Sequence, residues 1–167
     1  MSFILIINIL LMLAIAICLD LKSGKIPNTY NLCWMIYGML YSLLFVVGGL
    51  LNSVLGIGIP FLGLMLLFKL GAIGAGDIKL FMAIGSFLGM QVIPVIVYSF
   101  LLCALYGVLR GATVALRRLR KGDGTNVLQH LVAGFRGNTR VAFSVFIGLG
   151  FVVYAIKTMW GGGWLEI

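Results

Sequence analysis

Acidic residues are scarce in this chain, and their positions indicate where chemistry could occur. The 167 residues include only four: Asp20, Asp77, Asp123 and Glu166. Asp123 lies in a Gly-Asp-Gly turn, where aspartate is common for conformational reasons, and Glu166 is next to the last residue. Asp20 and Asp77 each lie at the edge of a long apolar segment. Because an ionisable residue at membrane depth is costly, this placement predicts a functional site.

Two carboxylates held close together offer a definite chemistry. They cannot both ionise readily, so they share one proton. The ionised carboxylate can take a proton from water while the protonated one polarises a peptide carbonyl, as in aspartic proteases. This chemistry needs no metal or cofactor, and His130, the single histidine, has no ligand set around it in the sequence. Asp20 and Asp77 are therefore predicted to form a catalytic pair.

Two other interpretations of these aspartates remain open. Each carboxylate could simply pair with a nearby lysine in the headgroup region (Lys22, Lys25 or Lys79). The pair could also form a proton or cation relay in a transporter or channel. Secondary transporters usually bind near the bilayer midplane, whereas both aspartates are expected at one membrane face, which favours the protease.

The elements that must position the pair are predicted to be transmembrane helices. Hydrophobic residues make up 62% of the chain and charged residues 10%, a composition that suits lipid better than water. The expected fold is all-α, a single membrane-embedded domain over 1–167 with about six spans. The six apolar segments are 2–19, 30–48, 53–70, 78–90, 92–116 and 141–159.

Positive charge predicts the orientation of these spans. Of the 12 lysines and arginines, all but Lys157 lie in or next to three gaps, 20–29, 71–77 and 117–140. Cytoplasmic loops collect such residues, so these gaps are expected inside the cell and both termini outside. The predicted location is the inner (cytoplasmic) membrane. The basic residues form no continuous face with interleaved aromatics, so no nucleic-acid partner is expected.

Residues around the aspartates have predicted positioning roles. Gly74 and Gly76 precede Asp77, and glycine permits a close approach of backbone that could hold an extended substrate; glycine-mediated helix packing is the alternative. Lys79 is expected to position the site. Pro27 and Asn28 are expected to form the turn into the second span, with Asn28 as the helix N-cap.

Two motifs in this sequence resemble those of a known family. The segment from Asp20 to Ile26-Pro27-Asn28 and the segment Gly74-Ala75-Gly76-Asp77 are similar to the paired motifs of the type IV prepilin peptidases, membrane aspartic proteases of the GxGD type. The resemblance covers roughly residues 10 to 110 and the six-span layout. It implies that Asp20 and Asp77 are the catalytic pair.

The resemblance also implies a substrate. The family cleaves the basic leader of prepilins and prepilin-like proteins at the cytoplasmic membrane face. Larger bacterial members carry a loop with paired cysteines and methylate the new N-terminus, whereas this sequence has no C-x-x-C pair. The sequence therefore resembles a small, peptidase-only member. It departs from the family in lacking a proline at 140–145, which leaves the role of the last span open.

Overall fold

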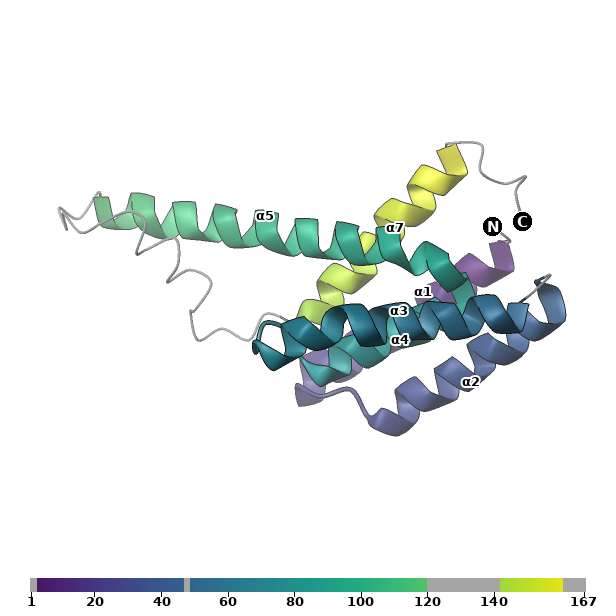
Figure 1. Cartoon of the computed structure of the whole chain (residues 1–167). Coiled ribbons are helices and arrows are strands. Elements are labelled where there is room, and N and C mark those ends of the chain that lie inside the picture. The colour runs from purple at the N-terminus through teal and green to yellow at the C-terminus, as the bar shows by residue number, and fades with distance from the viewer. Residues whose placement is uncertain (1–2, 47–48, 120–141, 161–167) are drawn as a thin grey trace.

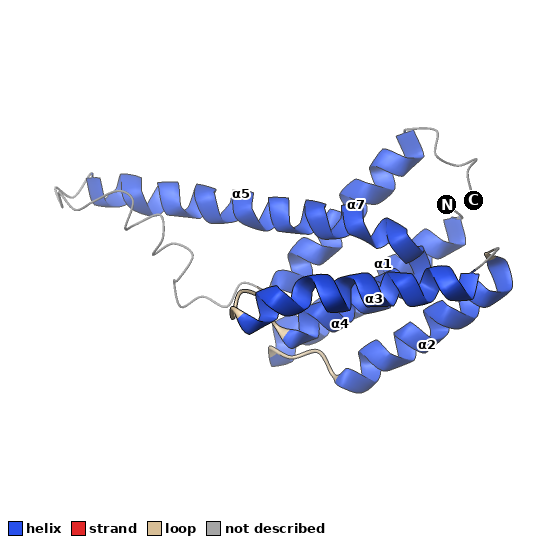
Figure 2. Cartoon of the chain, in the orientation of Figure 1, coloured by secondary structure: helices blue, strands red, loops and turns tan. Residues whose placement is uncertain are grey.

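The protein is built from α-helices in the part of the chain that the structure describes. The computed structural model describes residues 3–46, 49–119 and 142–160, with side chains as far as residue 113 in the fifth helix. Within these ranges there is no strand (Figure 2), so the predicted all-α class is confirmed. The helices are α1 (Phe3–Ser23), α2 (Asn28–Phe45), α3 (Gly49–Lys69), α4 (Ala75–Leu88), α5 (Val92–Leu119) and α7 (Phe143–Trp160), with a 3-10 turn, η1 (Gly89–Gln91), before α5.

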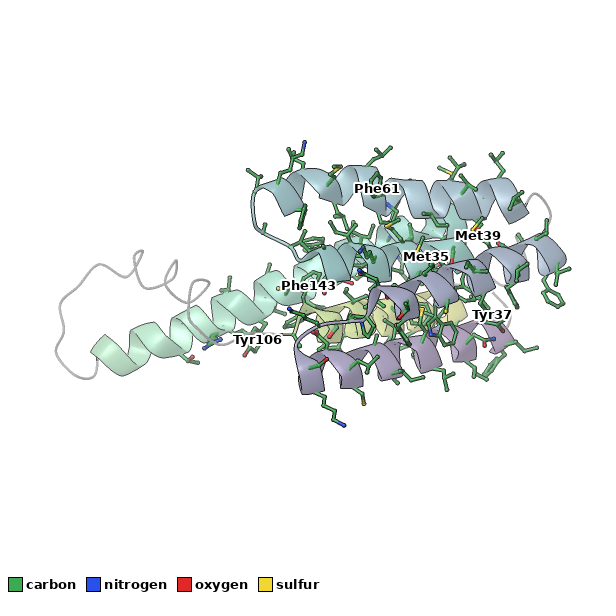
Figure 3. All side chains as sticks on the ribbon, turned by 90° about the horizontal axis from the view of Figure 1, so that it is seen from below. Met35, Tyr37, Met39, Phe61, Tyr106 and Phe143 are labelled. Carbon is green, nitrogen blue, oxygen red and sulfur yellow. The ribbon has the colours of Figure 1, made fainter. Side chains whose placement is uncertain are left out.

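Each predicted apolar segment overlaps one of these helices. Four helical stretches have the length and composition of membrane spans: 3–23, 49–69, 143–160, and 75–113, which joins α4, η1 and part of α5. Large apolar side chains of α3 such as Leu62 are exposed, and Phe61 is exposed on the outside of the bundle (Figure 3), as lipid contact requires. The count of six crossings and the outside position of the termini stay predictions.

Several helices extend further than the apolar segments. α1 continues through Ser23, so Asp20 lies in its last turns and not in a loop. The helix ends where Gly24 adopts a left-handed conformation (φ 65°) and its N–H donates to the Asp20 carbonyl at 2.8 Å. α4 begins at Ala75, so Asp77 lies in its first turn. Hydropathy marks where the apolar segment ends, whereas backbone hydrogen bonding continues the helix into polar residues.

The boundary of the 117–140 loop was also predicted too early. α5 continues to Leu119, because the arginines in this stretch are good helix formers. The rest of the predicted loop, with His130 and Asp123, lies outside the described residues, as does Glu166.

The helices bring distant parts of the sequence to one end of the bundle. The α1–α2 loop, the α3–α4 loop and the start of α7 lie together there, while the start of α1 and the end of α7 lie at the other end (Figure 1). α4 is central and packs against α1, α2, α3, α5 and α7. Its Phe81 and Ile84 side chains are fully buried. α4 is therefore the central helix, and its partly exposed start lies at the end of the bundle where these segments meet.

Small residues allow α3 and α4 to pack closely. Gly56 and Gly85 face each other so closely that a Cβ on either one would overlap the other's backbone carbonyl. Beside them, Ser53 Oγ of α3 donates to the Ser86 carbonyl of α4 at 2.7 Å. Close backbone approach through small residues is the usual means of helix association in membranes. This contact holds the helix that carries Asp77.

The turn between α4 and α5 is η1. Gly89 has φ 60°, and the Met90 N–H donates to Asn52 Oδ1 of α3 at 3.2 Å. Beyond this turn α5 runs back past the start of α4 and extends beyond the other helices (Figure 1). Pro94 falls in the first turn of α5, where proline costs no helical hydrogen bond.

Candidate active site

The two aspartates predicted to work together line the same cavities. Asp20 comes from the end of α1 and Asp77 from the first turn of α4, and both side chains are half-buried. Two adjoining cavities, of about 520 and 420 Å³, each have both residues in their walls. The two carboxyl groups are near enough to interact electrostatically. The fold thus brings together the two acidic residues that the sequence singles out.

The first turn of α4 holds Asp77 in place. Gly74, with φ −80° and ψ 149°, is the N-cap of this helix, and its N–H donates to the Asp77 carboxylate. In return, the Asp77 N–H donates to the Gly74 carbonyl at 3.2 Å. The Asp77 carboxylate thus supplies one half of a capping box, whereas Gly74 has no side chain to supply the other half. The Gly74 N–H therefore orients the Asp77 carboxylate. The residue of this loop with a left-handed backbone is Gly71 (φ 71°).

Gly76 leaves open space beside Asp77. A Cβ built on Gly76 would have no atom within 4 Å, and the residue lines the smaller cavity. It lies in the first helical turn, where a backbone N–H has no carbonyl four residues earlier within the helix to accept its hydrogen bond. This position offers donors next to the carboxylates.

The loop after α1 forms the opposite wall of the smaller cavity. Gly24, Lys25, Ile26, Pro27 and Asn28 line it together with the two aspartates. Gly24 is absent from the sequence predictions, although a glycine just after a run of helix formers is a recognisable helix stop. The predicted turn at Pro27 and Asn28 is therefore part of the site wall.

The predicted capping role of Asn28 is wrong. Asn28 is the first residue of α2, and Pro27 is the N-cap, with φ −59° and ψ 138° and no side-chain cap hydrogen bond. Proline is already fixed near the φ that this position needs. The Asn28 side chain is used elsewhere: its Oδ1 accepts a hydrogen bond from Lys79 Nζ at 2.7 Å. This bond ties α2 to α4 and directs Lys79 to Asn28 at the edge of the smaller cavity.

The Lys79–Asn28 hydrogen bond is open to a double-mutant cycle. We expect Lys79→Met and Asn28→Ala each to lower the free energy of unfolding by about 1 kcal/mol, because each removes the same bond. The double variant is expected to cost no more than either single one, a coupling of about 1 kcal/mol. Denaturant titration of the purified protein in mixed micelles measures all three. Additive losses would show that the two side chains do not interact.

The start of α7 forms a wall that sequence reasoning missed. Ala142 and Phe143 line the larger cavity, and the Phe143 ring (labelled in Figure 3) contacts the rings of Phe81 and Phe100. The next residue, Ser144, is fully buried, and its Oγ donates to Asp20 Oδ2 at 2.6 Å. No motif in the sequence singles out this serine, because its partner is 124 positions away.

The site and fold define a multi-pass membrane protein with a pair of carboxylates at one end, and comparisons with known proteins place it in a family. The chain belongs to the type IV leader peptidase family, whose model matches residues 6–108. The family membership expected from the two motifs is thereby confirmed.

A curated relative extends this comparison. The chain is 37% identical over 114 residues to the "Prepilin leader peptidase/N-methyltransferase" of Pectobacterium carotovorum subsp. carotovorum. The match covers 63% of this chain and 38% of the relative, so it spans well under half of that protein's length. No solved structure matches the chain.

Proposed function

We propose that this protein is an aspartic endopeptidase that cleaves the basic leader of prepilin-like proteins at the cytoplasmic face of the inner membrane. The observation that carries the proposal is the shared lining of two adjoining cavities by Asp20 and Asp77. They come from different helices and lie in the two motifs that identify the family. We assign them as the catalytic pair.

The chemistry is hydrolysis of a peptide bond by activated water. One carboxylate takes a proton from a water molecule, whose oxygen forms a bond to the peptide carbonyl carbon. The other carboxyl group gives its proton to the carbonyl oxygen. When the tetrahedral intermediate collapses, the C–N bond breaks and the amine takes the proton that the first carboxylate received from water. The second carboxylate takes a proton back from a hydroxyl of the intermediate, which leaves as the new carboxyl group. Every proton is carried by the two aspartates, so the reaction needs no other group.

The two cavities suit an extended peptide that passes the carboxylates. The smaller cavity lies against the loop after α1 and the larger one against the start of α7, so a chain crossing both would place its scissile bond between them. The backbone N–H of Gly76, in the first turn of α4, is a donor for a carbonyl of such a peptide. The proposed substrate contacts are therefore Gly76 and the cavity walls, with Gly74, Pro27, Asn28 and Lys79 positioning them.

The substrate class rests on the family and on the curated relative. Both are named for leader peptidase activity. The relative is also named as a methyltransferase, and the match covers 38% of its length. We assign only the peptidase reaction to this chain, because the residues in hand supply a carboxylate pair.

A proton or cation relay is the second candidate function. It is favoured by the presence of two half-buried carboxylates in a bundle of apolar helices. Against it, the start of α4 and the end of α1 lie at one end of the bundle (Figure 1), whereas a relay needs a path to the other.

Cleavage by the purified chain tests the proposal. The protein is reconstituted in liposomes with a purified prepilin, and leader removal is followed by gel shift and by N-terminal sequencing of the product. We expect a single cut at the junction of the basic leader and the apolar helix. Proton uptake by the same liposomes, with a pH-sensitive dye inside, distinguishes the relay: uptake without cleavage would overturn the peptidase.

A further inference from the structure

We propose that Ser144 of α7 is a positioning residue for the aspartate pair, holding Asp20 in the orientation that peptide cleavage needs; this inference rests on the proposed function. Ser144 Oγ donates to Asp20 Oδ2 at 2.6 Å, a length typical of a strong hydrogen bond to a carboxylate. The bond joins the start of α7 to the end of α1. It gives the last helix a role at the site.

The acceptor of this hydrogen bond distinguishes Ser144 from the other helical serines. Ser53 Oγ also donates to another helix, but to a backbone carbonyl. The hydroxyls of Ser23, Ser86 and Ser99 each donate to a backbone carbonyl three or four residues earlier in their own helix. That local bond is the ordinary choice for a helical serine. Ser144 lies in the first turn of α7 and donates to a carboxylate of another helix instead.

Burial makes the bond specific. The Ser144 side chain is fully buried, so it is shielded from competing water. Asp20 is half-buried and lines both cavities. With Oδ2 bonded to Ser144, rotation of the carboxyl group is restricted, and Oδ1 is the oxygen left to meet water or Asp77. A carboxylate fixed in this way needs no reorganisation when the water attacks.

The test compares three serine variants in the prepilin cleavage assay. Ser144→Ala is expected to lower kcat by about 10- to 100-fold and to leave KM unchanged within twofold. Losses of this size are usual when a residue that orients a functional side chain through a hydrogen bond is removed, as is known for metal ligands in other proteins. Ser144→Thr keeps the hydroxyl and is expected to recover most of the rate. Ser99→Ala is the matched control: Ser99 is also fully buried and lies in α5 against Gly150 of α7, but donates to the Val95 carbonyl. It is expected to cleave at the wild-type rate.

A readout without substrate covers the case in which the threonine variant does not accumulate. The carboxyl infrared bands lost in Asp20→Asn belong to Asp20, and we expect these bands to change frequency in Ser144→Ala but not in Ser99→Ala. Unchanged Asp20 bands, or a kcat of Ser144→Ala within twofold of wild type, would overturn the role of Ser144. An equal loss in Ser99→Ala would do the same. Failure of the peptidase itself looks different, because the wild type would then leave prepilin uncut or Asp20→Asn would cleave it normally.

Discussion

Replacing either Asp20 or Asp77 with asparagine is expected to lower kcat for leader cleavage by about 1000-fold or more. Asparagine has nearly the same size as aspartate, and its side-chain oxygen can still accept hydrogen bonds such as those from Ser144 and the Gly74 N–H. It cannot take up or release a proton, so both the activation of water and the protonation of the carbonyl fail. Timed cleavage of purified prepilin at saturating concentration measures the effect.

The third aspartate of the sequence, Asp123, provides a control for loss of charge. Asp123→Asn removes one negative charge at a position outside the described residues, and we expect it to retain the wild-type rate within twofold. All three variants should accumulate in the membrane to equal levels. If Asp20→Asn or Asp77→Asn kept a tenth of the wild-type kcat, a mechanism based on the pair would be ruled out.

Replacing Gly56 or Gly85 with alanine is expected to destabilise the protein by about 3 kcal/mol, the upper end of the usual cost of overpacking. The added methyl group would overlap a backbone carbonyl of the facing helix, and a backbone atom cannot rotate away as a side chain can. The helices α3 and α4 must then separate, which also breaks the hydrogen bond from Ser53 to the Ser86 carbonyl. Denaturant titration in mixed micelles gives the free energy of unfolding.

Two other glycines of α3 provide matched controls. A Cβ on Gly58 or Gly63 would meet no atom within 4 Å. Alanine there only improves helix propensity, so we expect Gly58→Ala and Gly63→Ala to be neutral or to stabilise by up to about 1 kcal/mol. Equal losses at all four positions would mean that the α3–α4 contact has no special importance.

The fold class and the candidate pair were predictable from sequence because both depend on local signals. Long apolar runs specify helices wherever lipid is the solvent, and a rare acidic residue at the end of such a run is conspicuous. Asp20 and Asp77 are both rare acidic residues at the end of a long apolar run. That they line common cavities follows once the first and fourth helices carry them at the same end of the bundle.

The remaining details depend on tertiary contacts that no local pattern encodes. Asparagine is a residue type that often caps helices, but the Asn28 side chain accepts a hydrogen bond from Lys79 of α4. Pro27 occupies the N-cap position instead. Ser144 is one serine among several, and only the packing of α7 against α1 brings it to Asp20. The helix ends differ from the predicted segment ends because polar residues such as Lys22 and Ser23 lie beyond the apolar segment but still belong to the helix.

The assignment of roles within the pair is also affected by tertiary structure. The dipole at the start of α4 favours a negative charge on Asp77 and the dipole at the end of α1 disfavours one on Asp20, which makes Asp77 the candidate base and Asp20 the candidate carrier of the shared proton. The positive charges of Lys22 and Lys25 act in the opposite direction. The structure adds a second helix start, because Ser144 lies in the first turn of α7 and contacts Asp20. Asp20 thus lies at the end of α1 but against the first turn of α7, and because the two dipoles act on it in opposite directions, the dipole argument no longer separates the roles.

The contact between α7 and Asp20 has a thermodynamic consequence. The larger cavity is walled by Phe143 of α7 as well as by Asp20 and Asp77, so a peptide that fills it must bind the docked form of α7 more tightly than any undocked form. Binding and docking are then linked, and a ligand at concentration [L] stabilises the docked helix by RT ln(1 + [L]/Kd). A peptide bound in the larger cavity therefore stabilises the contact between α7, the last helix of the described residues, and α1, the first.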